Sequence, residues 1–140
     1  MEFLQKGYNL YLLIAAVVSG VLFLWPSVAK LLSKTKEVGV AQAVQLINRQ
    51  DAVVVDVREP AEFRSGHIPN ARNIPLGQIA DKAKDLDKLK AKPLLLSCQT
   101  GARSAQAAAT LMRAGFTDVY NLSGGMNAWQ QANMPLQKEK

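Results

Sequence analysis

The single cysteine of this chain stands where a nucleophile would be placed. Cys98 is the only cysteine among the 140 residues. It follows the apolar run 93–97, which is typical of a buried strand, and precedes residues 99–104, which lead into an Ala-rich segment typical of a helix. The first N–H groups of a helix have no partner within it, so they stabilise an anion placed before them. The sequence therefore predicts that Cys98 is held as a thiolate, its reactive form.

The residues after Cys98 are expected to form a cradle for a negatively charged group. A glycine in this loop can take a positive φ at little cost, which lets successive N–H groups point to one centre. Arg103 adds a positive charge and a planar fork of donors that suits an oxyanion. We expect Cys98 and Arg103 to be catalytic. The expected substrate-binding residues, acting mainly through main-chain N–H groups, are Gln99, Thr100, Gly101, Ala102 and Ser104.

This arrangement predicts covalent catalysis through the sulfur. A thiolate is already a nucleophile and needs no adjacent base, which fits a chain with one histidine. The alternative is a buried, inert thiol, which is what many lone cysteines are.

The elements around Cys98 must alternate between strands and helices to place it at the edge of a parallel sheet. Val40, Ala43, Val44 and Ile47 follow the spacing of an amphipathic helix, and the β-branched run 52–57 is typical of a strand buried on both faces. Further strands are expected at 71–75, 93–97 and 118–122, and further helices at 60–64, 76–89, 104–114 and 125–132. The alternation predicts an α/β fold with a parallel sheet covered on both faces.

The N-terminal part is expected to be a membrane anchor. An uncharged run extends from Gly7 to Ala29, long enough as a helix to cross the hydrocarbon core of about 30 Å. Three lysines follow between residues 30 and 36, whereas one precedes it, so the positive-inside rule places the following domain in the cytoplasm. The alternative is an exported, periplasmic protein whose signal peptide is cleaved near Ala29.

The resulting organisation has five parts. We expect an N-terminal tail (1–7), a transmembrane helix (8–29), a charged linker (30–37), one globular domain (38–136) and a C-terminal tail (137–140).

Composition argues against other ligands and partners. Half of the net charge of +6 lies in residues 1–36, and both signs mix over residues 81–92, so we expect no nucleic-acid partner. One cysteine and one histidine cannot supply the usual ligands of a zinc site, and we expect neither a metal nor a cofactor.

Four segments together resemble the rhodanese family of sulfurtransferases. They are DVREPAEF at 56–63, GHIPNARNIP at 66–75, CQTGARS at 98–104 and LSGGMNAW at 122–129. The resemblance implies a small open parallel sheet of about five strands flanked by helices, here preceded by one transmembrane helix. It also implies that Cys98 carries a sulfane sulfur as a persulfide, taken from a donor anion such as thiosulfate and passed to cyanide or a thiol.

The layout with one anchored domain is similar to a bacterial subgroup of the family. That similarity implies the bacterial inner membrane as the location and allows for a membrane-protein partner. Outside the loop, we expect Asp56, Arg58 and His67 to have structural roles, with the first two pairing or hydrogen-bonding to hold the active loop.

Three other functions remain open at this point. A phosphatase or arsenate reductase of the same fold uses a longer loop than the four residues between Cys98 and Arg103. A tethered protein-interaction module would not need the intact loop that this chain has. A redox sensor would oxidise at Cys98, although the chain offers no second cysteine to resolve the product.

Overall fold

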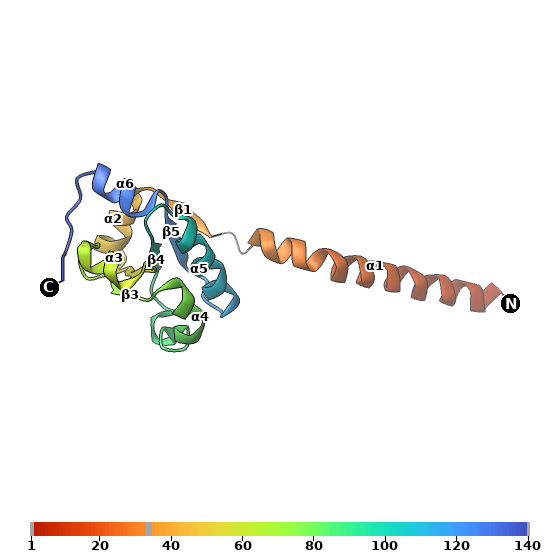
Figure 1. Cartoon of the computed structure of the whole chain (residues 1–140). Coiled ribbons are helices and arrows are strands. Elements are labelled where there is room, and N and C mark those ends of the chain that lie inside the picture. Colours follow the sequence, from red (N-terminus) through yellow and green to blue (C-terminus); the bar gives the residue numbers. More distant parts are fainter. Residues whose placement is uncertain (1, 33–34, 140) are drawn as a thin grey trace. The chain divides into compact units, whose positions relative to one another are not determined.

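The computed structural model describes residues 2–32 and 35–139, which form two separate units divided after Lys34 (Figure 1). The first unit is one helix, α1 (Glu2–Leu32), and the second is an α/β domain. Residues 33 and 34 of the expected linker, and the terminal residues 1 and 140 of the expected tails, lie outside the described residues.

Helix α1 contains one segment that is long and apolar enough to cross a membrane. This segment, Gly7–Pro26, has 20 residues and a mean hydropathy of 1.9. Its large side chains, among them Tyr11, Phe23 and Trp25, are exposed. Such a helix suits a membrane anchor, and a signal sequence has the same properties.

Five parallel strands form the sheet, in the order β1-β5-β4-β2-β3. The strands are β1 (Lys36–Val38), β2 (Val53–Asp56), β3 (Arg72–Asn73), β4 (Leu94–Ser97) and β5 (Val119–Leu122). Strand β4 is central and all four of its residues are buried, because helices cover both faces of a parallel sheet. Cys98 directly follows β4, so it lies at the carboxyl edge of the sheet, where ligands bind in such folds.

Helices cover both faces of this sheet (Figure 1). They are α2 (Val40–Arg49), α3 (Pro60–Ser65), α4 (Ile79–Lys82), α5 (Ala102–Arg113) and α6 (Gly125–Gln131). On one face Leu94 and Leu96 pack with residues of α4 and α5, including Leu111. On the other, Leu95 packs with residues of α2 and α6, including Leu46 and Trp129. The predicted fold class is confirmed.

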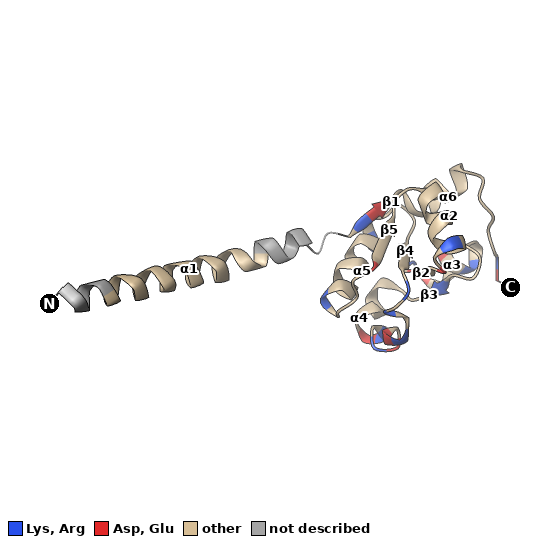
Figure 2. Cartoon of the chain, turned by 180° about the vertical axis from the view of Figure 1, so that it is seen from behind, with Lys and Arg blue, Asp and Glu red and all other residues tan. Residues whose placement is uncertain are grey.

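The prediction of a single helix over residues 76–89 is wrong. The segment consists of a 3-10 turn (Leu76–Gln78), the short helix α4 and a second 3-10 turn (Asp87–Leu89). Hydrogen bonds between residues three apart, such as Leu89 N–H to the Leu86 carbonyl (2.8 Å), tighten the chain here. The tighter winding turns Leu86 and Leu89, which are three residues apart, toward the same core. Lys and Asp residues are interspersed along this segment, as the blue and red stretches beside α4 show (Figure 2).

The sheet begins earlier than the sequence indicated. Strand β1 takes Lys36 and Glu37, two residues of the range expected to be linker, and pairs them with Tyr120 and Asn121 of β5. The sequence pattern did not indicate this strand, because two of its three residues are charged. Val38 is the only one of the three that is buried. An edge strand needs only one buried face, so two polar residues out of three do not prevent pairing.

Candidate active site

The sulfur of Cys98 lies inside the turn that starts helix α5. The main-chain N–H of Gly101 donates a hydrogen bond to Sγ (N to S, 3.0 Å), and Ser104 Oγ lies 3.4 Å from the same atom. Gly101 has a φ of +103°, a conformation that side chains rarely adopt, and it caps the helix. Cys98 itself is 1% exposed. The expected placement of a thiol before a helix N-terminus is therefore found in the structure.

This environment favours the ionised form of Cys98. Burial alone would raise the pKa of the thiol, but hydrogen bonds from the Ser104 hydroxyl and from the N–H groups of Ser104, Gly101 and Thr100 outweigh it. The pKa of Cys98 is thus below its ordinary value. Donors fixed by the backbone stabilise the charge of a thiolate, which is how low-pKa cysteines arise at helix N-termini.

Behind Ser104, a polar chain connects the active turn to the edge of the sheet. Ser104 Oγ also hydrogen-bonds to Asn121 Oδ1 and to the Gly101 carbonyl (3.1 Å). Asn121, buried in β5, donates from Nδ2 to both carboxylate oxygens of Glu37 (3.0 and 3.3 Å). A hydroxyl has one proton, so the donation from Ser104 is shared among Cys98 Sγ, Asn121 and Gly101.

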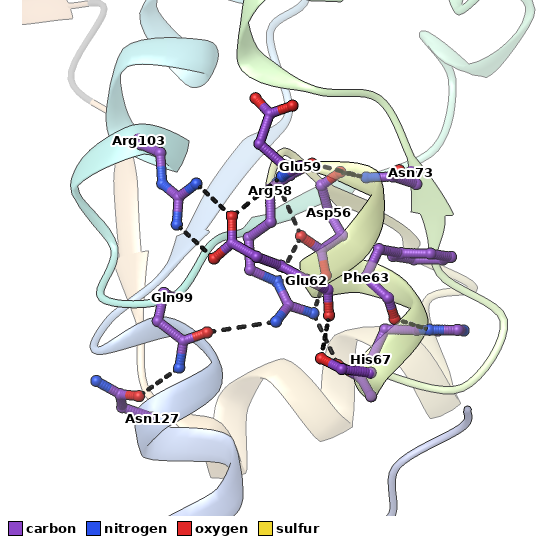
Figure 3. Close-up of polar contacts among 12 residues, drawn as sticks. Asp56, Arg58, Glu59, Glu62, Phe63, His67, Asn73, Gln99, Arg103 and Asn127 are labelled. Carbon is purple, nitrogen blue, oxygen red and sulfur yellow. Dashed lines mark hydrogen bonds and ion pairs between the residues drawn. The ribbon is translucent and has the colours of Figure 1, made fainter. Parts of the chain in front are cut away.

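A buried ion pair fixes the first residue of the loop (Figure 3). Arg58 and Asp56 are 2% and 1% exposed. Arg58 donates from Nη2 to Oδ2 of Asp56 (2.7 Å) and from Nε to both Oδ1 and Oδ2 (3.0 Å each). Arg58 Nη1 donates to Gln99 Oε1 (3.3 Å), and Gln99 Nε2 donates to Asn127 Oδ1 of α6. The side chain of Gln99 is therefore held by neighbours, and its expected contribution to binding rests on the main chain.

The side chain of Arg103 meets an acidic partner that the sequence analysis did not single out. Its Nη1 and Nη2 atoms donate to the two carboxylate oxygens of Glu62 on α3 (2.8 and 3.0 Å; Figure 3). The hydrogen bond from Arg103 lowers the pKa of Glu62 and burial opposes this, while the same bond raises the pKa of Arg103. We expected Arg103 to supply a positive charge and a fork of donors to the cradle; in the structure that fork is paired with the carboxylate of Glu62.

The remaining expected residues have clear surroundings. His67 is buried, stacks on the Phe63 ring (centroids 3.7 Å apart, 6° between planes), and places Nδ1 2.7 Å from the Phe63 carbonyl oxygen. These contacts are those of a structural group. Thr100 and Ala102 have exposed side chains at the surface of the loop. In the part of the chain that the structure describes, no cluster of three His, Cys, Asp or Glu residues offers a metal site.

The sequence analysis missed Glu62, Asn121 and Glu37. Glu62 had a signal, because an acid three residues after Glu59 at the start of a helix is a capping-box position, and that box is present. Asn121 also had a signal in the sequence. A buried amide within the apolar stretch 119–122 needs hydrogen-bonding partners, which marks it as part of a polar contact. Glu37 lay in the range expected to be linker and gave no signal.

The fold and the site together define a class of protein. It is an α/β domain that carries a lone thiol at a helix N-terminus, on the carboxyl edge of a parallel sheet. The model of the family described as "Rhodanese-like domain" matches residues 39–132. The chain belongs to this family, as its four motifs indicated.

Individual relatives and structures agree with this assignment. The chain is 47% identical over 78 residues to the uncharacterised protein YqhL of Bacillus subtilis, covering 56% of this chain and 60% of that protein. It is 40% identical over 99 residues to a thiosulfate sulfurtransferase, GlpE, of Pseudomonas putida, covering 71% and 88%. The crystal structure of a rhodanese-related protein from Thermoplasma volcanium matches with a TM-score of 0.67 at 31% identity, covering 74% of this chain and 99% of that one.

Proposed function

We propose that this protein is a sulfurtransferase that carries a sulfane sulfur on Cys98. The observation that carries the proposal is the hydrogen bond from Gly101 N–H to Cys98 Sγ at the start of α5, within a turn that lowers the pKa of the thiol. Similarity to GlpE, named a thiosulfate sulfurtransferase, supports the reaction class.

The reaction has two halves. The Cys98 thiolate attacks the outer sulfur of a donor; with thiosulfate the S–S bond breaks, sulfite leaves with the bonding electrons, and Cys98–S–S⁻ remains. In the second half an acceptor such as cyanide or a thiolate attacks the outer sulfur, which restores the Cys98 thiolate and forms thiocyanate or a new persulfide. Both halves conserve charge and need no oxidant, and this two-step covalent route predicts ping-pong kinetics.

The loop residues then have distinct roles. The N–H groups of residues 99–104 stabilise the thiolate and, after loading, the persulfide anion. Asp56 and Arg58 hold Gln99 and thus the course of the loop, and His67 holds the segment after α3. Arg103 contributes positive charge from the first turn of α5, where it is paired with Glu62.

Mass spectrometry of the intact chain tests the proposal directly. After treatment with thiosulfate and removal of the excess, the full-length protein should gain one sulfur atom. Because Cys98 is the only cysteine, that gain reports one site. Addition of cyanide should remove it and release thiocyanate, and the Cys98→Ser variant should do neither. A wild-type chain that gains no sulfur from any sulfane donor would contradict the proposal.

We also propose that α1 anchors the domain in the bacterial inner membrane with the domain in the cytoplasm. The apolar segment Gly7–Pro26 and the lysines that follow it support this orientation. Protease added to spheroplasts should leave the domain intact and digest it only after lysis. Digestion in intact spheroplasts, or recovery of a soluble periplasmic form shortened by about 29 residues, would refute the orientation.

A further inference from the structure

Both arginines that contact the loop or lie on it, Arg58 and Arg103, are paired with a carboxylate. Arg58 is matched by Asp56, and Arg103 is matched by Glu62 through two hydrogen bonds. Glu37, at the end of the Ser104–Asn121 chain, adds a carboxylate whose recorded partners are the neutral side chains of Asn121 and Ser123. Among the described residues of the site, positive potential at Cys98 therefore comes mainly from main-chain N–H groups.

This charge balance bears on which donor can approach. Thiosulfate brings two negative charges to a thiolate that already carries one, so its approach depends on an available cation. An alkyl hydropersulfide, R–S–SH, delivers the same outer sulfur with at most one negative charge. A guanidinium that is already bound by a carboxylate attracts an anion much less than an unpaired one.

On the proposed transferase function, we propose that Glu62 is a specificity-determining residue that occupies the anion-binding fork of Arg103 and makes hydropersulfides, rather than dianionic thiosulfate, the preferred sulfur donors of Cys98. The step with such a donor is balanced: the Cys98 thiolate attacks the outer sulfur, the S–S bond of the donor breaks, and R–S⁻ leaves. The proton of the donor stays on the transferred sulfur or is lost to water.

Glu62 can be altered without disturbing its helix. Besides binding Arg103, Glu62 Oε1 accepts a hydrogen bond from the Glu59 N–H (3.2 Å), which completes the capping box of α3. Glutamine serves at this capping position as well as glutamate. Glu62→Gln therefore keeps the cap and removes only the charge that neutralises Arg103.

The test compares two donors on the full-length protein in detergent micelles. Single-turnover rates of sulfur gain on Cys98 are measured with thiosulfate and with hydroxyethyl hydropersulfide, whose organic group is uncharged. Asp85→Asn, which removes an exposed acid from the segment after α4, is the matched control.

We expect Glu62→Gln to raise the thiosulfate rate constant about fivefold, equivalent to about 1 kcal/mol. The hydropersulfide rate constant should change less than about twofold, and the gain with thiosulfate should shrink as salt is added, because it is electrostatic. The control should leave both rate constants within about twofold of the wild type. A role of Glu62 in the fold alone would move both donors together and would not depend on salt.

Two results separate the inference from the function on which it rests. If Cys98 loads from both donors but the ratio of the two rate constants is the same in wild type and Glu62→Gln, the inference is overturned and the transferase stands. If the wild type loads from neither donor, both are overturned.

Discussion

Gly125 at the start of α6 is the position where one added methyl group should do most damage. A Cβ there would lie 2.2 Å from the carbonyl oxygen of Cys98 and 2.9 Å from the carbonyl carbons of Cys98 and Gln99. These atoms belong to the backbone of the active loop, so a rotamer change cannot relieve the overlap. Gly125 also has a φ of +54°.

The cost can be estimated from the contacts that must break. If α6 moves away, the hydrogen bonds from Met126 N–H to the Cys98 carbonyl (2.7 Å) and from Asn127 N–H to the Gln99 carbonyl (3.1 Å) are lost. Each contributes about 1 kcal/mol, and a side chain in the left-handed region adds roughly 1–2 kcal/mol. Gly125→Ala should therefore lower the free energy of unfolding by about 3–4 kcal/mol. For a domain of about 100 residues that corresponds to a Tm lower by at least roughly 12 °C.

Gly39→Ala is the matched control. Gly39 precedes α2 with a φ of −79°, and an added Cβ would meet nothing within 4 Å. Thermal unfolding followed by the fluorescence of Trp129 measures both variants; the Trp25→Phe background makes this buried side chain the sole tryptophan. If Gly125→Ala melts within about 3 °C of Gly39→Ala, the close approach of α6 to the loop is not as described.

Three other outcomes are expected. Ser104→Ala removes a hydrogen bond to the thiolate, so the pKa of Cys98 should rise toward its ordinary value. A titration of thiolate absorbance measures this pKa, and an unchanged midpoint would exclude the hydroxyl as a donor. Asp56→Asn leaves the guanidinium of Arg58 buried without a counter-charge. It should lower the free energy of unfolding, measured in urea, by roughly 3–5 kcal/mol. The control Asp51→Asn, at an exposed ion pair, should lower it by less than about 1 kcal/mol. Glu62 has a lowered pKa in the folded protein, so its ion pair with Arg103 stabilises the fold above pH 4.5. This contribution, below about 1 kcal/mol, is lost as the pH falls further. A Glu62→Gln variant with the same acid unfolding curve as the wild type would refute this contribution.

The sequence located the central strand and the active turn because local patterns determine both. The run before Cys98 is apolar throughout, as β4 requires, and Gly101 marks the point where the chain must turn into α5. These features depend on neighbours within a few residues, so composition and spacing were enough to place them.

The ion pair between Arg103 and Glu62 could not be found in the same way. The two residues are 41 positions apart, and their meeting depends on how α3 and α5 sit at the edge of the sheet. Likewise, Asn121 and Glu37 are 84 positions apart and meet only because β1 pairs with β5. Local pattern reveals that such side chains need partners, whereas the tertiary fold decides which partners they have.

The loop that carries Cys98 is held from two sides, and this explains how the pKa of the thiol can be lowered, and its position fixed, without an adjacent base. The start of α5 donates N–H groups to the sulfur of Cys98, while the start of α6 donates N–H groups to the carbonyls of Cys98 and Gln99. Substitutions other than proline leave a main-chain donor in place, so the lowered pKa of Cys98 should survive most side-chain changes in residues 99–104. It should fail when the course of the backbone changes. Proline at residue 101 removes the N–H that bonds to Sγ, and a bulky residue at Gly125 displaces α6; these changes should abolish sulfur loading more completely than loss of the Arg103 charge.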